Sequence, residues 1–483
     1  MAPKGLGWII IDSLDTMMLM NLTTQLVHAR EWLSKSLTWD QDQDVNTFET
    51  TIRMLGGLLS AHYLSNQFPD MAPIKDDDPG TPGEDLYLEK ARDLADRLLS
   101  AFDTPSGVPY ASVNLGKFEG IASHDTMGAS STAETTTLQL EFKYLAKLTG
   151  EKVFWDKVEK VMQVVDENNE TDGLVPIYIS PSTGKFVGSN IRLGSRGDSY
   201  YEYLIKQYLQ TNKAEKVYED MWYESLAGVR KHLVTYTEPS QFTIIGERPD
   251  GLQHDLSPKM DHLVCFMPGT IALAATGGLP EKEARRKKTW TEQNDKDMKL
   301  ARELMHTCWG MYKYMATGLA AEITYFNVAK PPPNSRILIF GAGTVGLSAC
   351  LAAKLTSPEK LVVVDHSILK LAMLPTCIKE AATDLVDSSD AKEDELVNRL
   401  KALTRDGQGY DYALDCVGRG DLVKIGHLAL RSRGTVVTVG GSTDTALQVT
   451  LSQHLTRGIT YKGTHQGDSV PSVVSPYATR AGV

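Results

Sequence analysis

The hydrophobic period of the chain changes abruptly at Lys330, and this change constrains the fold more than any other feature. Up to about Val328 the apolar residues recur mostly at helical spacing, most clearly in the stretch 46–64. After the proline-rich segment 331–335, short β-rich runs alternate with helical stretches, as in a parallel α/β sheet. The 483 residues therefore predict a multidomain chain with an all-α part followed by an α/β part.

The same pattern predicts the individual elements and the bounds of the domains. Further helices are expected over 131–148, 198–210, 216–234 and 295–316. In the second part we expect the strands ILIF and LVVVD on either side of a glycine turn and a helix, and β-rich runs over 410–418 and 434–441. The predicted bounds are 5–328 for the helical domain, 329–333 for a linker, 334–472 for the α/β domain and 473–483 for a tail.

Charge and apolar content exclude several classes of protein. The 61 Asp and Glu against 50 Lys and Arg give a net charge of −11, which would repel nucleic acid phosphates and anionic lipid. The most apolar early stretch, 8–20, contains Asp12 and Asp15 and has neither the length of a membrane span nor the features of a signal peptide. We therefore expect no nucleic acid partner, no membrane span and no signal peptide or anchor.

The five cysteines lie at 265, 308, 350, 377 and 416, with no Cys-x-x-Cys pair and no histidines at zinc spacing. We therefore assign no metal ligands.

Three carboxylates stand at the starts of predicted helices. Asn46 and Glu49 form a capping box whose glutamate would cover the amide of its own N-cap, and Ser131 and Glu134 repeat it. Asp198 directly precedes an aromatic helical run and would itself be an N-cap. For each carboxylate alone, capping is the simpler explanation. If the helices gather their N-termini at one end, however, the carboxylates converge on an acidic pocket able to hold a hard cation or to cleave a glycosidic bond.

The sequence also resembles a known family in seven blocks that occur in the family's order. Among them are GLGWIIIDSLDTM, TAETTTLQLEF, LGSRGDSYYEYLIKQYL and KMDHLVCFMPGT. The blocks span residues 5–17, 44–65, 132–142, 172–179, 193–209, 259–270 and 317–328. Together they resemble the class I α-1,2-mannosidases of glycoside hydrolase family 47.

The resemblance implies an (α/α)7 barrel, a bound calcium ion, inversion of configuration and trimming of high-mannose N-glycans in the endoplasmic reticulum or Golgi. It implies that Glu49 is the general acid and that Asp198 and Glu322 are further catalytic acids. It places four more residues in the sugar pocket: Arg53, Glu134, Arg196 and His262. For His262 a purely structural role is an equal alternative.

The resemblance also implies a disulfide between Cys265 and Cys308. Cys350, Cys377 and Cys416 lie in the second part of the chain and are most simply explained as buried apolar residues. After Phe326-Asn327-Val328 the family continues to an Arg-Pro-Glu motif that carries the proposed base and to a threonine that binds calcium. Neither has a match in this sequence. We therefore expect poor turnover of α-1,2-mannose.

A glycine motif opens the second part. Gly341, Gly343 and Gly346 follow the strand ILIF, and Asp365 ends the next strand 19 residues after Gly346. This order of strand, turn, helix, strand and acid is typical of dinucleotide sites, where the glycines admit a pyrophosphate and the acid favours NAD over NADP. The alternative is a glycine turn that binds nothing. Residues 334–472 resemble the cofactor domain of zinc-type medium-chain alcohol dehydrogenases, whose separate catalytic domain has no counterpart here.

Three interpretations therefore remain open: a calcium-dependent mannosidase, an NAD-binding dehydrogenase-like protein, and a catalytically inactive fusion. The third includes the case in which the sequence joins two neighbouring genes in error.

Overall fold

The computed structural model describes residues 5–71, 85–124, 126–237, 240–313, 329, 331–372, 382–440 and 451–463. Contacts between Cα atoms divide the chain into two compact units. The first consists of Met1–Thr235, Ile245–Ser257 and Leu263–Arg302, and the second of Tyr236–Ile244, Pro258–His262 and Glu303–Val483. The second unit thus holds the α/β part and short segments of the α-rich part, and the domain bounds predicted above stay a prediction.

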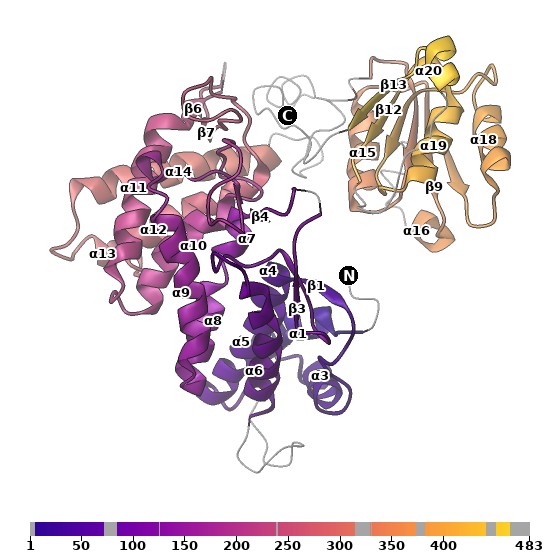
Figure 1. Cartoon of the computed structure of the whole chain (residues 1–483). Helices are drawn as coiled ribbons and strands as arrows, with labels where there is room; N and C mark the ends of the chain where they lie inside the picture. The colour runs from indigo at the N-terminus through magenta and orange to yellow at the C-terminus, as the bar shows by residue number, and fades with distance from the viewer. Residues whose placement is uncertain are drawn as a thin grey trace. The chain divides into compact units, whose positions relative to one another are not determined.

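The first part of the chain is rich in helices (Figure 1). Its helices are α1 (Trp8–Asp12), α2 (Leu14–Leu19), α3 (Thr23–Lys35), α4 (Thr47–Glu49), η1 (Thr50–Leu55), α5 (Gly56–Gln67), α6 (Leu86–Leu98), η2 (Leu99–Phe102), α7 (Thr132–Thr135), α8 (Gln139–Thr149), α9 (Lys152–Asp166), η3 (Thr171–Gly173), α10 (Asp198–Gln210), α11 (Lys216–His232), η4 (His262–Phe266), α12 (Met267–Thr276), α13 (Glu281–Ala284) and α14 (Glu292–Lys313).

The prediction of an all-α part was too simple, because short strands stand between these helices. They are β1 (Asp44–Asn46), β2 (Ser112–Asn114), β3 (Glu119–Ile121), β4 (Ser130–Ser131), β5 (Tyr178–Ile179), β6 (Val234–Tyr236) and β7 (Thr243–Ile245). They form the sheets β1-β2-β3, β4-β5 and β6-β7. Strands of two or three residues are too short to show an alternating pattern in the sequence.

The predicted helix over 46–64 is present, but its middle is a π-helix, η1. The Thr51 hydroxyl donates to the Thr47 carbonyl oxygen at 2.8 Å, which draws that carbonyl away from the regular helical ladder. A Cβ at Gly57 would lie 2.7 Å from the Ile11 carbonyl oxygen, so the following helix packs directly on the α1 backbone. The widened turn follows Glu49 and contains Arg53.

The predicted helix over 131–148 is divided into α7 and α8. The division falls at a run of threonines whose hydroxyls donate to carbonyl oxygens of the preceding turn. Thr136 bonds the Thr132 oxygen at 2.7 Å, and Thr137 bonds the Ala133 oxygen at 2.5 Å. Such side-chain bonds compete with the helix ladder, so a helical pattern in the sequence does not guarantee a continuous helix.

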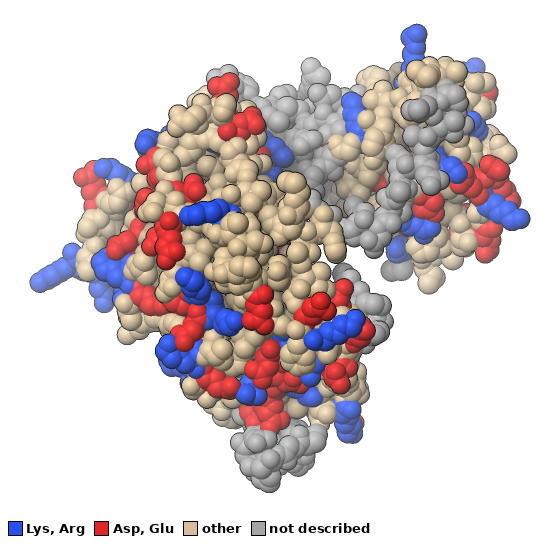
Figure 2. Space-filling view, viewed as in Figure 1, with Lys and Arg blue, Asp and Glu red and all other residues tan. Residues whose placement is uncertain are grey.

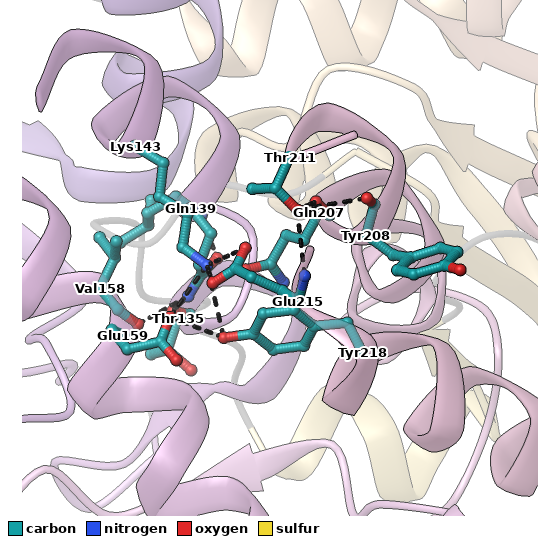
Figure 3. Close-up of polar contacts among 11 residues, drawn as sticks. Thr135, Gln139, Lys143, Val158, Glu159, Gln207, Tyr208, Thr211, Glu215 and Tyr218 are labelled. Atoms are coloured by element: carbon teal, nitrogen blue, oxygen red, sulfur yellow. Dashed lines mark hydrogen bonds and ion pairs between the residues drawn. The ribbon is translucent and has the colours of Figure 1, made fainter. Parts of the chain in front are cut away.

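A buried cation joins α8, α9 and α11 in the first unit (Figure 3). The Lys143 side chain is 1% exposed, and its Nζ lies 2.8 Å from Glu215 and 2.9 Å from Glu159. The Tyr218 hydroxyl donates to Glu159 at 2.8 Å, and the Tyr218 ring centroid lies 4.5 Å from the Lys143 Nζ. Burial raises the pKa of Glu215, and Lys143 opposes that rise. The Lys143 ammonium group therefore links α8 to α9 and to the start of α11 through its two ion pairs.

The second part forms a sheet of six parallel strands in the order β10-β9-β8-β11-β12-β13. The strands are β8 (Arg336–Phe340), β9 (Lys360–Asp365), β10 (Asp384–Asp387), β11 (Tyr410–Asp415), β12 (Leu430–Thr438) and β13 (Thr460–Gly463), and the helices are α15 (Thr344–Leu355), α16 (Ile368–Ala372), α18 (Glu393–Ala402), α19 (Gly420–Ala429) and α20 (Leu451–Arg457). The sequence predicted the four central strands, and the structure adds the edge strands β10 and β13.

Alternate residues of β8 enter different cores, as expected for a sheet covered on both faces. Ile337 and Ile339 pack with residues of α15 and α16. Leu338 and Phe340 pack with residues of α18 and α19. Figure 1 shows α15 and α18 on opposite sides of the sheet. The run 336–340 is wholly buried, which explains its continuous hydrophobicity.

Charge is mixed on the visible surface: Figure 2 shows acidic and basic side chains interspersed over the helices. Within the described residues, one helical stretch, His262–Ala284, is apolar and long enough to cross a membrane by length and composition. It consists of η4, α12 and α13, and between the last two Gly277 and Gly278 have positive φ of 62° and 82°. The stretch is therefore three short helices, with no single straight one.

Candidate active site

Asn46 connects the starts of two helices. Its Oδ1 accepts a hydrogen bond from the Glu49 amide at 2.7 Å, which caps α4. Its Nδ2 donates to the Glu134 carboxylate at 3.3 Å, across 88 residues of sequence. Ser131 caps α7 by accepting from the Glu134 amide at 3.3 Å. The side-chain caps predicted at Asn46 and Ser131 are confirmed, and Asn46 links the two helix starts that carry Glu49 and Glu134.

The start of α10 joins the same group through backbone contacts. The Ala133 amide donates to the Arg196 carbonyl oxygen at 2.9 Å, and the Ser131 hydroxyl donates to the same oxygen at 3.4 Å. Arg196 has a positive φ of 73°, a conformation that turns the chain into the helix at a cost for a residue with a side chain. Its guanidinium carbon lies 5.3 Å from the centroid of the Tyr178 ring. Three acid-bearing helix starts thus lie together in the first unit.

Glu49 is engaged by an arginine one turn later. The Arg53 Nε donates to Glu49 Oε2 at 2.7 Å, and the Arg53 Nη1 lies 3.5 Å from Asp12 Oδ2. The hydrogen bond that Arg53 donates to Glu49 raises the pKa of the Arg53 guanidinium. The Glu49 side chain is 40% exposed, so the pair is open to solvent and to a ligand. The predicted bond from Glu49 back to its own N-cap is replaced by this ion pair.

Glu134 is the more buried of the two glutamates. Burial raises its pKa, while the hydrogen bond from Asn46 and the charge of Arg196 lower it. The charge of Glu49 raises it further. A carboxyl group in this setting holds its proton more readily than an exposed one.

Asp198 is the first residue of α10, and the N-cap is Gly197, so the prediction that Asp198 is the cap was wrong by one position. A Cβ at position 197 would lie 2.1 Å from the Arg192 carbonyl oxygen, so close packing requires glycine at the cap. The Asp198 Oδ1 accepts from the Ser199 amide at 2.8 Å, at the positive end of the helix.

The remaining predicted residues of the sugar pocket are placed differently. His262 belongs to the second unit, where its Nε2 lies 2.8 Å from the Tyr312 hydroxyl and its ring packs edge-on to Tyr312. Glu322 lies outside the described residues. Their assignment to the site stays a prediction.

The cysteines follow the predicted pairing where they are described. Cys265 and Cys308 are disulfide-bonded, and Cys350 and Cys416 are free. Because these four account for all the cysteines except Cys377, which lies outside the described residues, the two bonded cysteines pair with each other. Burial raises the pKa of the Cys350 thiol to about 12, as expected for a small apolar core residue.

The three glycines of the α/β part have different structural reasons. Gly341 has a φ of 98°, which favours glycine. A Cβ at Gly346 would lie 1.8 Å from the Gly341 carbonyl oxygen, so the helix packs directly on the turn. A Cβ at Gly343 would meet nothing within 4 Å, which leaves open space at the start of α15. The three glycines thus provide a tight turn, close packing of the helix on that turn, and open space beside it.

Asp365 lies at the end of β9 beside this turn. Its Oδ2 accepts from the Ala342 amide at 2.8 Å, and its Oδ1 accepts from the Ser367 amide at 2.9 Å. The carboxylate therefore ties the glycine turn to the neighbouring strand, a structural role that the sequence did not reveal. Each oxygen retains lone pairs that could accept from a ribose hydroxyl.

The structure adds Asp12 and a second role for Asn46 to the predicted site residues. Asp12 contacts Arg53 although 41 residues separate them. The residue lies in one of the blocks that carry the family resemblance, but no spacing rule pairs it with Arg53. Within the described residues, no group of three or more His, Cys, Asp or Glu side chains is placed to hold a metal ion.

Comparisons with known proteins show what each part of the chain resembles. The family model described as Glycosyl hydrolase family 47 matches residues 1–340, and the model described as Zinc-binding dehydrogenase matches residues 344–479. A mannosyl-oligosaccharide 1,2-alpha-mannosidase from Candida albicans is 55% identical over 328 residues, which cover 68% of this chain and 55% of that protein. An endoplasmic reticulum mannosyl-oligosaccharide 1,2-alpha-mannosidase from Schizosaccharomyces pombe is 48% identical, over 67% of this chain and 60% of that protein.

The chain thus spans little more than half the length of these relatives. An α-1,2-mannosidase from Trichoderma reesei shares the fold, with a TM-score of 0.56 and 24% identity over 74% of each chain. Because the family model covers more than half of its residues, the chain belongs to glycosyl hydrolase family 47.

Proposed function

We propose that the α-rich part acts on α-1,2-linked mannose of high-mannose N-glycans and that its helices follow the (α/α)7 barrel of the family. The observation that carries this proposal is the junction of the α4, α7 and α10 starts, which brings Glu49, Glu134 and Asp198 to one region of the first unit. Membership of the family and the names of the relatives support the choice of substrate.

In this proposal Glu49 protonates the glycosidic oxygen, and its ion pair with Arg53 must loosen for the carboxyl to carry a proton. Arg53 and Arg196 donate hydrogen bonds to hydroxyl oxygens of the sugar. The Glu134 carboxylate accepts hydrogen bonds from hydroxyl groups of the sugar. Asp198 and Glu322 contribute negative charge around the glycosidic bond that is cleaved. Inversion requires a base that activates water on the opposite face, and we assign it to no described residue.

Within the described residues, no group of three or more His, Cys, Asp or Glu side chains is placed to hold the calcium that the family implies. We therefore assign calcium no step.

The test is release of mannose from a high-mannose glycan by the chain and by Glu49→Gln. Loss of a general acid typically lowers the rate by about 10²- to 10⁴-fold, and we expect that loss in the variant. Glu31→Gln is the matched control, because Glu31 is exposed and pairs only with Lys35 on its own helix among the described residues. Since turnover by this chain is itself expected to be poor, binding of α-1,2-mannobiose is measured in parallel.

Binding without release, weakened by Arg53→Met, would support the alternative of a catalytically inactive sugar-binding fusion. If the chain neither binds α-1,2-mannobiose nor releases mannose, the proposal is refuted.

We further propose that the protein acts in the lumen of the endoplasmic reticulum. The relatives from S. pombe and Saccharomyces cerevisiae are named as endoplasmic reticulum enzymes, and a disulfide suits an oxidising compartment.

A second function is supported by one observation in the α/β part, namely the open space at Gly343 between the tight turn and the closely packed helix. We propose that this turn binds the pyrophosphate of NAD in a Rossmann arrangement, with Asp365 accepting from a ribose hydroxyl. Bound NAD would supply a nicotinamide that exchanges a hydride. The strand order, with β8 central and a crossover to β11, is the doubly wound order of such domains.

A further inference from the structure

A cavity lined by both polar and apolar atoms lies on the first unit. It has a volume of about 770 Å³ and is lined by one face of α11 and by the segment that leads into α14. This volume falls within the range of about 300–1,000 Å³ that is typical of small-molecule sites. None of the residues assigned above to the mannosidase site lines it.

The charges at this cavity are already compensated. The Arg230 Nη2 lies 2.7 Å from the Asp297 Oδ1, and the Asp297 side chain is 2% exposed. The Lys231 Nζ lies 2.7 Å from the Asp172 Oδ2. Each cation therefore faces one carboxylate, and an anionic ligand would gain little net attraction. The cavity favours a neutral ligand.

The wall nevertheless offers several open hydrogen-bonding groups. Gln293 donates through Nε2 to the same Asp297 oxygen at 2.8 Å, which leaves its Oε1 free to accept. Within the described residues, the hydroxyls of Tyr223 and Thr289 and the Nη1 of Arg230 have no hydrogen-bond partner. Asn294 is held by Thr291 and by the Ala275 carbonyl oxygen, so it fixes the start of α14.

One aromatic side chain completes the wall. Tyr223 is 36% exposed, so part of its ring is available to an apolar surface. Burial, aided by the charge of Asp297, raises the pKa of its hydroxyl, which stays protonated and able to donate. A sugar ring presents an apolar face bordered by hydroxyls that both donate and accept, and this wall is complementary to both properties.

We propose that the cavity between α11 and α14 is a binding site for a neutral sugar, with Tyr223 against the face of the ring and Arg230, Gln293 and Thr289 bonding its hydroxyls. Asp297 is a positioning residue that holds both Arg230 and Gln293 in place. The site is independent of the mannosidase residues, so the chain could hold a glycan at a second point.

The test is amide hydrogen exchange of the chain with mannose and, separately, with inorganic phosphate as the probe. We expect mannose to slow exchange in segments 223–231 and 289–297, and phosphate to leave them unchanged. Tyr223→Ala and Gln293→Met should each weaken mannose binding about tenfold, as expected when one or two contacts are lost. Both positions are exposed, so the fold should tolerate the changes.

Tyr63→Ala is the matched control, because Tyr63 is 47% exposed and lies on α5. With mannose present, Tyr63→Ala should show the same protection of segments 223–231 and 289–297 as the unchanged chain. Glu49→Gln should show it too, which distinguishes this site from the proposed active site. No protection by mannose would overturn the proposal, and so would protection by phosphate alone, which would mark an anion site.

Discussion

Glu141 is a carboxyl group whose surroundings disfavour its charge. It lies on α8, where its Oε1 accepts from the Tyr203 hydroxyl at 2.9 Å. Its Oε2 is buried without a hydrogen-bond partner among the described residues. Burial raises the pKa of Glu141 from 4.5 to about 7. This burial could not be predicted from the sequence, because a glutamate on an amphipathic helix ordinarily faces water.

We predict that the pH dependence of stability changes in Glu141→Gln. Because the pKa is higher in the folded state, the folded protein holds this proton more tightly, and its stability falls as the pH rises from 4.5 through about 7. The loss is about 3 kcal/mol over this range. The variant should lose this dependence. Urea unfolding at pH 4.5 and pH 7.5 measures it, with Glu292→Gln, whose side chain is 83% exposed, as control. Equal slopes in both proteins would contradict the prediction.

At the candidate site, the sequence identified Glu49, Glu134 and Asp198 correctly as residues at helix starts, because caps are local signals. It could not show that Asn46 reaches Glu134 or that Asp12 reaches Arg53, since those contacts depend on which helices become neighbours. The roles of all these residues stay predictions.

At the scale of elements, the Lys143 cluster links three helices through one cation (Figure 3). We predict that Lys143→Met destabilises the protein by about 3 kcal/mol, because two partly buried carboxylates lose their counter-ion. The measurement is urea unfolding. Lys152→Met is the control, since that side chain is 81% exposed, and it should change stability by less than about 0.5 kcal/mol.

Adding Glu215→Gln to Lys143→Met should recover part of the loss, because it removes one of the two uncompensated charges. If the second change deepened the loss instead, the cluster would owe its stability to packing.

The glycine turn allows two neighbouring substitutions to be distinguished. Gly346→Ala should unfold the α/β part or weaken it severely, because its Cβ would lie 1.8 Å from a carbonyl oxygen. Gly343→Ala should fold normally, since its Cβ meets nothing, yet lose NAD binding because the methyl group occupies the space of the pyrophosphate. Circular dichroism and calorimetry with NAD and NADP measure the two effects. Unchanged NAD binding in Gly343→Ala would rule out the proposed cradle.

Long periodic elements were predictable and short or interrupted ones were not. The helices over 198–210 and 216–234 and the central strands have enough residues to show a period. The edge strands β10 and β13 have four residues each, and Asp384 and Asp387 make β10 resemble a loop. The threonine hydroxyls that divide α7 from α8 act through side-chain bonds that hydrophobic periodicity does not contain.

At the scale of the whole molecule, one covalent bond closes a long segment of the chain. Cys308 follows Cys265 by 43 residues, and both are disulfide-bonded. We predict that replacing both by serine lowers stability by about 4 kcal/mol, the chain-entropy value for a loop of this length. Thermal unfolding measures it, and Cys350→Ala, which keeps an apolar side chain at a free buried cysteine, is the control.

Peptide mapping without reduction should recover Cys265 and Cys308 in one linked pair, with Cys350 and Cys416 free. A linked pair that includes Cys350 or Cys416 would contradict the structure.

Asn46 gives the first unit a property that neither glutamate has alone. The Asn46 side-chain amide accepts a hydrogen bond from the Glu49 backbone and donates one to the Glu134 carboxylate, so the positions of the two acids depend on the same side chain. Asn46→Asp replaces only the donating nitrogen, which would retain the cap and turn an attraction for Glu134 into repulsion. The effects of substitutions at Glu49 and Glu134 should consequently be non-additive in a double-mutant cycle, and relatives that change one of these three positions should tend to change another.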